Sequence, residues 1–161
     1  MTAAIHIENI RKTLGGREVL KNVTFDVNHG DIFGYLGPNG AGKTTTIRLL
    51  LGLLRADGGC LEILGQDIGE KSARMKTGFS LDPDGLYDTM SALENLEYYA
   101  AIYEVKNPGE RMEEILAMVG LADRAGDRVG SYSKGMRQRL SLARTMVHNP
   151  DVLILDEPTS G

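Results

Sequence analysis

Residues 37–44 are Gly-Pro-Asn-Gly-Ala-Gly-Lys-Thr, which matches the spacing G-x-x-x-x-G-K-[ST] of a phosphate-binding loop. Gly40 and Gly42 leave room for backbone N–H groups to curl around phosphate oxygens, and a helix starting there adds the positive end of its dipole. Lys43 can reach the β and γ phosphates, and the Thr44 hydroxyl can ligand Mg²⁺. The motif therefore predicts a nucleotide site. The residues expected to bind the nucleotide are Gly37, Pro38, Asn39, Gly40, Ala41, Gly42, Lys43, Thr44 and Thr45.

Two adjacent carboxylates follow an apolar stretch near the end of the sequence. Residues 152–155 predict a buried strand, and Asp156 and Glu157 come directly after it. Ligands of α/β sheets bind at the carboxyl ends of strands, so both acids are expected at such an edge. Asp156 can hold the metal through its water, and Glu157 can act as general base on an attacking water while Lys43 stabilises phosphate charge. An acidic strand end that only caps a loop is the weaker alternative beside a phosphate loop.

The pattern of apolar residues predicts the elements that carry the phosphate loop. Residues 5–10 and 19–27 interleave polar with apolar side chains around Gly15-Gly16, which predicts an antiparallel entry layer. Residues 31–36 are a short apolar run, expected to be a strand, and residues 43–54 carry apolar side chains at helical spacing. The order is therefore strand, glycine loop, helix, as a phosphate-binding loop requires.

The remaining sequence predicts two more strands, a helical insert and a closing helix and strand. Residues 60–64 and 77–81 favour strands, residues 90–119 carry apolar stripes at helical spacing, and residues 134–148 predict a helix. Residues 152–155 are typical of a strand buried on both faces in a parallel sheet. The predicted fold is α/β, with an antiparallel entry layer, a mainly parallel core sheet and a helical subdomain. Its predicted division is a nucleotide-binding core of residues 1–82 and 137–161, and a helical subdomain of residues 83–136.

Composition limits the classes of function. The chain has 161 residues, of which 42% are hydrophobic and 25% charged, so it has the make-up of an ordinary globular domain. Its net charge of −4 argues against a nucleic-acid partner. Cys60, the sole cysteine, is expected to be a small buried hydrophobe in a reducing compartment. The apolar run 47–54 is interrupted by Arg48 and Gly52, so we expect a cytoplasmic protein that meets a membrane through a partner.

Three motifs taken together resemble those of the ABC ATPases. Residues 37–45 resemble the Walker A motif, residues 153–157 the Walker B motif, and residues 132–136 (Tyr-Ser-Lys-Gly-Met) the signature motif. The resemblance implies a P-loop NTPase of the ABC type with ATP and Mg²⁺ as cofactors. Residues 37–54, 57–59 and 86–96 are further similar to stand-alone ATPase subunits of prokaryotic drug, antibiotic and ion exporters.

The resemblance implies two protein partners. ABC ATPases dimerise head to tail, so Ser133 and Gly135 are expected to contact the γ phosphate held by a second ABC ATPase domain. A membrane-spanning permease subunit is the other partner, with residues 82–95 as the coupling zone and the chain peripheral on the cytoplasmic face of the membrane. Lys134 and Met136 replace a glycine and a glutamine common in the signature, and Leu14 stands where an adenine-stacking aromatic is common.

Two further departures concern catalysis. Asp82 stands where the family has a glutamine that approaches the metal and the attacking water. Asp82 either contacts the metal through water, as a further catalytic group, or is only the first residue of the turn 82–85. The resemblance also implies a D-loop and a switch histidine beyond Gly161, so we expect the chain to be C-terminally truncated and poorly active alone.

Two other functions remain to be weighed against a transporter ATPase. A soluble ABC ATPase acting on the ribosome or DNA usually carries tandem domains, long coiled coils or a basic arm, and the sequence shows none of these. A small-molecule kinase would leave the signature motif and the pair Asp156 and Glu157 unexplained. The sequence therefore favours an ATPase that powers a separate exporter.

Overall fold

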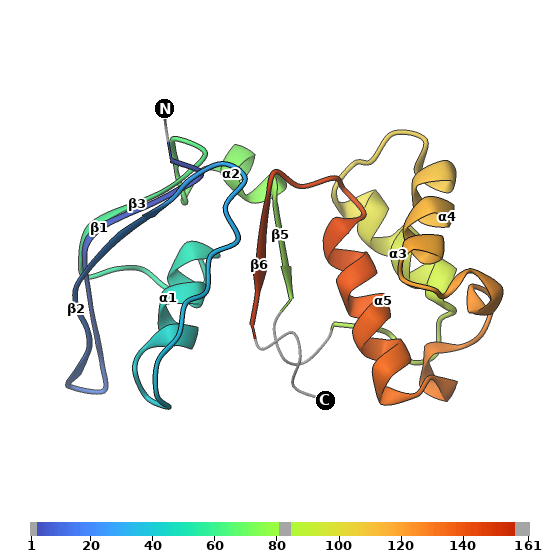
Figure 1. Cartoon of the computed structure of the whole chain (residues 1–161), viewed down its shortest axis with the longest axis horizontal. Coiled ribbons are helices and arrows are strands. Elements are labelled where there is room, and N and C mark those ends of the chain that lie inside the picture. Colours follow the sequence, from blue (N-terminus) through green and yellow to red (C-terminus); the bar gives the residue numbers. More distant parts are fainter. Residues whose placement is uncertain (1–2, 81–84, 157–161) are drawn as a thin grey trace. The chain divides into compact units, whose positions relative to one another are not determined.

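The computed structural model describes residues 3–80 and 85–156 of the chain (Figure 1). The chain divides into two compact units, Met1–Arg74 and Met75–Gly161, which are described separately. Asp82 and Glu157, two of the predicted catalytic residues, lie outside the described residues.

The first unit is built on an antiparallel sheet. Its strands are β1 (Ile5–Leu14), β2 (Arg17–Val27), β3 (Gly58–Ile63) and β4 (Gln66–Asp67), hydrogen-bonded in the order β2-β1-β3-β4. Gly15 and Gly16 form the turn between β1 and β2 with positive φ angles of 56° and 79°, which glycine adopts without strain. The predicted antiparallel entry layer is confirmed.

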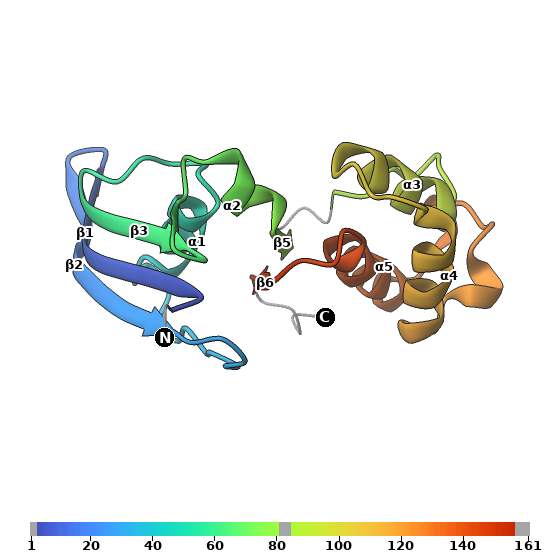
Figure 2. The ribbon, with the colours of Figure 1, turned by 90° about the horizontal axis from the view of Figure 1, so that it is seen from above.

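Helix α1 (Lys43–Leu50) packs beside the sheet, as Figure 2 shows. Leu49 of α1 is fully buried, as are Ile7 and Leu20 of the sheet, and each such side chain stabilises the fold by ~1.5–3 kcal/mol. The helix ends before residue 54, the predicted limit, because Gly52 takes a left-handed φ of 67° just after it. Helix α2 (Lys71–Met75) follows β4.

Residues 31–36 do not form the predicted strand, because the described residues include no neighbouring strand that pairs with them. An extended segment becomes a strand only by pairing. The segment is held by ring contacts instead: Phe33 stacks on Phe25 of β2 at 5.0 Å between centroids, and Tyr35 lies 5.3 Å from the same ring.

The second unit contains a parallel strand pair. Strands β5 (Thr77–Ser80) and β6 (Val152–Leu155) run in register from Thr77 opposite Val152 to Ser80 opposite Leu155. Both predicted strands are confirmed within the described residues. The prediction that β6 is buried on both faces is wrong: Leu153 is 45% exposed while its neighbours Val152 and Ile154 are buried.

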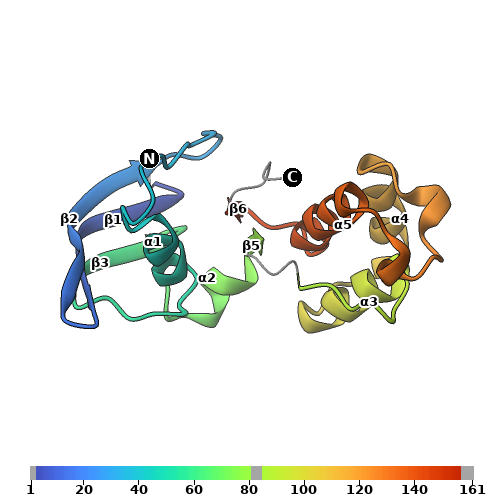
Figure 3. The same ribbon diagram turned by 90° about the horizontal axis from the view of Figure 1, so that it is seen from below.

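The helices of the second unit share one apolar core (Figure 3). They are α3 (Ala92–Ile102), α4 (Pro108–Met118) and α5 (Lys134–Met146), with the 3₁₀ turns η1 (Ala122–Arg124) and η2 (Val129–Ser131) between α4 and α5. The helical insert predicted for residues 90–119 is confirmed as α3 and α4. The fully buried side chains of the shared core include Leu96, Ile115, Leu116, Leu121 and Leu140.

Two arginines hold α4 and α5 antiparallel. Arg139 of α5 donates to the carbonyl oxygens of Val119 and Gly120 at the end of α4, at 3.0 and 3.1 Å. Arg111, near the start of α4, donates to the Met146 carbonyl at the end of α5, at 3.1 Å. Each helix therefore supplies the cation that satisfies the carbonyl end of the other.

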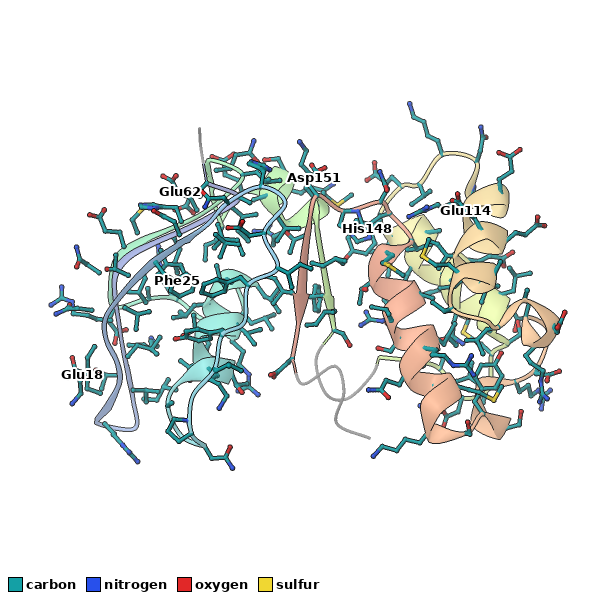
Figure 4. The ribbon with its side chains drawn as sticks, viewed as in Figure 1. Glu18, Phe25, Glu62, Glu114, His148 and Asp151 are labelled. Atoms are coloured by element: carbon teal, nitrogen blue, oxygen red, sulfur yellow. The ribbon has the colours of Figure 1, made fainter. Side chains whose placement is uncertain are left out.

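The segment after α5 is fixed by a stacked ring pair. The His148 ring, labelled in Figure 4, stacks on Tyr103 at 3.7 Å between centroids and 5° between planes. Burial lowers the pKa of His148, so the imidazole stays neutral near pH 7.

In the first unit, Cys60 is only partly buried, which corrects the prediction of a buried hydrophobe. Alternate side chains of β3 point to the more open face of the sheet, and Cys60 is one of them.

Candidate functional site

The predicted phosphate loop opens α1. Gly40 and Gly42 have left-handed φ angles of 81° and 88°, a conformation that favours glycine. A Cβ added at Gly42 would lie 2.5 Å from Cδ2 of Leu20 and 3.2 Å from the Val19 carbonyl, so glycine is required for space as well. Gly42 precedes the first turn of α1 and has no side chain to accept from its N–H groups. An anion can take that place, where the helix dipole favours negative charge.

The Lys43 ammonium lies over the loop. It donates to the carbonyl oxygens of Gly37 at 2.6 Å and Pro38 at 3.1 Å. The Ala41 amide closes the turn by donating to the same Pro38 oxygen at 3.1 Å. Lys43 is therefore already at the mouth of the loop, and a phosphate would replace neutral carbonyl partners by charged oxygens, which form stronger hydrogen bonds.

Thr46 is a loop-positioning residue that the motif does not contain. Its hydroxyl, in a side chain 1% exposed, donates to the Gly42 carbonyl at 3.1 Å and lies 3.3 Å from the Tyr35 hydroxyl. These contacts connect the aromatic segment before the loop with the helix after it. Only the run of hydroxyl residues after Lys43 could have drawn attention to Thr46 in the sequence. Thr44 is exposed and Thr45 partly buried at the start of the same helix.

Asp156 lies at the carboxyl edge of the parallel pair, as predicted. Its backbone N–H continues the ladder by donating to the Ser80 carbonyl of β5 at 3.1 Å, and its side chain is partly buried. Parallel strands end at the same edge, so Ser80, the last residue of β5, lies beside Asp156.

Ser133 and Gly135 of the predicted signature motif open α5. The Ser133 hydroxyl caps the helix by accepting from the Met136 amide at 3.2 Å. Ser133 and Gly135 are exposed, and a Cβ added at Gly135 would meet nothing within 4 Å. Tyr132 anchors the motif, because its hydroxyl donates to the Arg124 carbonyl at 2.6 Å. Burial raises the pKa of Tyr132, which keeps the phenol a donor.

The units thus carry different parts of the predicted site. The loop of residues 37–45 lies in the first unit, whereas Ser133, Gly135 and Asp156 lie in the second. A glycine-rich loop with left-handed residues at the start of a helix defines the class of protein: a P-loop α/β nucleotide-binding protein.

The chain matches the family described as ABC transporter over residues 20–160. It is 41% identical over 163 residues to the "Uncharacterized ABC transporter ATP-binding protein YhcH" of Bacillus subtilis (strain 168), covering 100% of this chain and 53% of that protein. It is also 41% identical over 165 residues to the "Nod factor export ATP-binding protein I" of Cupriavidus metallidurans, covering 100% and 54%. The chain belongs to the ABC transporter family of ATP-binding proteins, and it spans about half the length of these curated relatives.

A solved "ATP binding subunit of ABC transporter" has the same fold. It superposes with a TM-score of 0.89 at 26% identity, covering 99% of this chain and 68% of that chain. The likeness confirms the predicted fold class, an α/β P-loop NTPase of the ABC ATPase type. The names of the relative from Bacillus subtilis and of the solved subunit both describe ATP-binding proteins. Among residues 3–80 and 85–156, no helix is long and apolar enough to cross a membrane.

Proposed function

We propose that the chain binds Mg-ATP and, within its whole protein, hydrolyses it to drive export through a separate membrane-spanning permease. The observation that carries this proposal is the glycine loop of residues 37–45, whose left-handed glycines present the start of α1 to an anion. Family membership supports ATP as that anion, and the name of the Nod factor export relative supports export.

The loop and the edge of β6 have distinct proposed roles. Lys43 contacts the β and γ phosphates and stabilises the charge on the transferred group, while backbone N–H groups of the loop hold the phosphates in place. The donors fit Mg²⁺, which prefers oxygen: the exposed Thr44 hydroxyl would be a direct ligand, and Asp156 would act through water. When bound, Mg²⁺ would neutralise charge on the phosphate oxygens. Glu157 is the proposed general base that orients the attacking water, and Asp82 a further polar group near it.

We also propose that two such domains share each site. Ser133 and Gly135 would contact the γ phosphate held by the loop of a second ABC ATPase domain. Their exposure and the open space at Gly135 support this, since phosphate can approach the start of α5 closely. Lys134, exposed between them, adds positive charge there.

The permease is proposed to dock on an aromatic edge formed by Tyr87, Tyr98 and Ile102. The two tyrosines are 43% and 42% exposed and contact each other edge to face at 5.0 Å. Such exposed aromatics are enriched where proteins bind partners. Buried Asn95 holds the edge rigid: it accepts from the Tyr87 amide at 2.8 Å and donates to the carbonyls of Tyr87 and Ser91.

This docking edge belongs to the proposed helical subdomain, residues 83–136, whereas residues 1–82 and 137–161 are the proposed nucleotide-binding core. The chain would then be a cytoplasmic protein, peripheral on the cytoplasmic face of the membrane. No nucleic-acid partner is proposed, in keeping with the net charge of −4.

The test is ATP turnover by the whole protein, purified with its membrane partner. Glu157→Gln should leave the Kd for a fluorescent ATP analogue within about twofold and slow hydrolysis by at least about a hundredfold. Lys43→Ala should weaken binding itself. Unchanged turnover in the Glu157→Gln variant would refute the assignment of the base. Cofractionation with ribosomes instead of membranes would favour the alternative of a soluble ABC ATPase.

A further inference from the structure

Arg144 of α5 is a buried cation that the proposed function does not use. Its side chain is 8% exposed, and its Nη2 donates to the Phe79 carbonyl of β5 at 3.1 Å. Its Nε–H is buried and makes no hydrogen bond within residues 3–80 and 85–156. Burying a guanidinium whose Nε–H has no acceptor lowers the stability of the fold. The other contacts of Arg144 therefore call for a functional explanation.

Those other contacts reach α3 and the loop before it. The Tyr99 ring of α3 lies 4.8 Å from the Arg144 Cζ, within the range of a cation–π interaction. The Tyr99 hydroxyl donates to the Gly85 carbonyl at 2.6 Å. A Cβ added at Gly85 would lie 3.1 Å from that hydroxyl and 3.5 Å from the Arg144 Cζ, and Gly85 has a left-handed φ of 68°. The chain at Gly85 therefore lies against the Arg144–Tyr99 pair.

On its other side, Arg144 donates a hydrogen bond to β5, the strand whose last residue, Ser80, bonds the Asp156 amide. Alternate residues of a strand present their backbone groups to opposite sides. Because Ser80 accepts from Asp156, the Phe79 carbonyl faces away from β6, and Arg144 occupies that side. A second link, 3.1 Å between the hydroxyls of Ser80 and Ser141, joins α5 to β5 one residue further on.

The contacts of Arg144 thus form a continuous path between two proposed sites. One end is the aromatic docking edge, since Asn95 binds both backbone groups of Tyr87, two residues after Gly85. The other end is Asp156, whose amide bonds to β5 next to Phe79. Every step is a direct hydrogen bond, a ring contact or a chain neighbour.

We infer that Arg144 is a positioning residue for ATP hydrolysis, which couples the partner-docking edge to the carboxyl edge of β5 and β6. The inference rests on the proposed function. Arginine suits this role because its planar guanidinium can stack on the Tyr99 ring and, within its own plane, donate to the Phe79 carbonyl at the same time. Lysine cannot do both. A shift of the loop at Gly85 would therefore move the β5 edge, and with it the backbone of Asp156.

The test compares Arg144→Lys and Tyr99→Phe with a matched control, Arg111→Lys, in the whole protein with its membrane partner. Arg111 also donates to a backbone carbonyl and also has a buried Nε–H without a partner in the described residues, but it contacts the end of α5. Measurements are kcat and KM for ATP, the stimulation of turnover by the partner, and the Tm of each variant.

Arg144→Lys should lower kcat about tenfold and reduce partner stimulation, with KM within about twofold, because the phosphate loop is untouched. Tyr99→Phe should act in the same direction, and the double variant should lose less than the product of the two effects, since both act on Gly85. Arg111→Lys should lower the Tm by a similar amount without changing kcat.

Two results would overturn the inference. Arg144→Lys with unchanged kcat and stimulation would leave Arg144 a merely structural residue, as would an equal loss of kcat in Arg111→Lys. A wild-type protein that does not hydrolyse ATP would instead refute the proposed function, and the coupling role with it. The two failures are distinguishable because only the second involves the wild-type rate.

Discussion

Gly78, in the middle of β5, lies directly against the backbone of α5, and replacing it with alanine measures that contact. An added Cβ would overlap the Thr145 carbonyl oxygen and would lie 2.8 Å from Cδ2 of Leu153 and 3.0 Å from Cγ of Pro150. A carbonyl and a proline ring cannot rotate away, so the overpacking cost should be near the upper end of the usual range, ~3 kcal/mol. Alanine regains ~0.5–1 kcal/mol because glycine loses more backbone freedom on folding. The net loss should be ~2 kcal/mol.

For a chain of this size, that loss corresponds to a fall in Tm of ~4–8 °C, measurable by calorimetry. Gly109→Ala is the matched control, because an added Cβ there meets nothing within 4 Å and the residue lies in helix α4. The control should leave the Tm unchanged or raise it slightly, since alanine is the better helix former. Equal Tm values for Gly78→Ala and the wild type would mean that β5 does not pack on α5 at this distance.

Three more predictions concern other parts of the chain. Gly42→Ala should weaken binding of a fluorescent ATP analogue by at least about tenfold, because it strains a left-handed residue and crowds Leu20; unchanged affinity would contradict the loop geometry. Asn95→Ala should lower the free energy of unfolding in urea by ~2–3 kcal/mol, since it removes a buried side chain that bonds both backbone groups of Tyr87 and leaves the Tyr87 amide without its acceptor. For His6, the hydrogen bond with Asp26 raises the pKa above its ordinary value. The stabilising effect of His6 is therefore full below the unfolded-state pKa, ~6.5, and disappears as pH rises through the folded-state value. Urea titrations of His6→Gln and the wild type should converge at high pH, and a difference that grows with pH would contradict this sign.

Local signals in the sequence predicted the elements well. Alternation along residues 5–10 and 19–27 reflects one buried face, so it predicted the antiparallel layer, and the helical stripes of residues 90–119 predicted α3 and α4. The phosphate loop was predictable because Gly40 and Gly42 adopt left-handed backbone conformations, which favour glycine whatever the rest of the fold does. Each of these features depends on residues close in sequence.

What the sequence did not predict depends on distant partners. Residues 31–36 are apolar enough for a strand, but pairing is decided by a neighbour, and here the ring of Phe25 provides the contact. Arg144 gives no local signal, because its role rests on Phe79 and Tyr99, far away in sequence. The proposed roles of Asp82 and Glu157 remain predictions.

The cap at the start of α5 has a consequence for how an anion could be recognised there. A hydroxyl has one proton and two lone pairs. The Met136 amide uses a lone pair of Ser133, so the same oxygen can still donate its proton outward. Capping therefore leaves the Ser133 proton available to a ligand. A carboxylate at this position would cap the helix equally well but would repel an anion, whereas a hydroxyl can cap the helix and still donate to an anion.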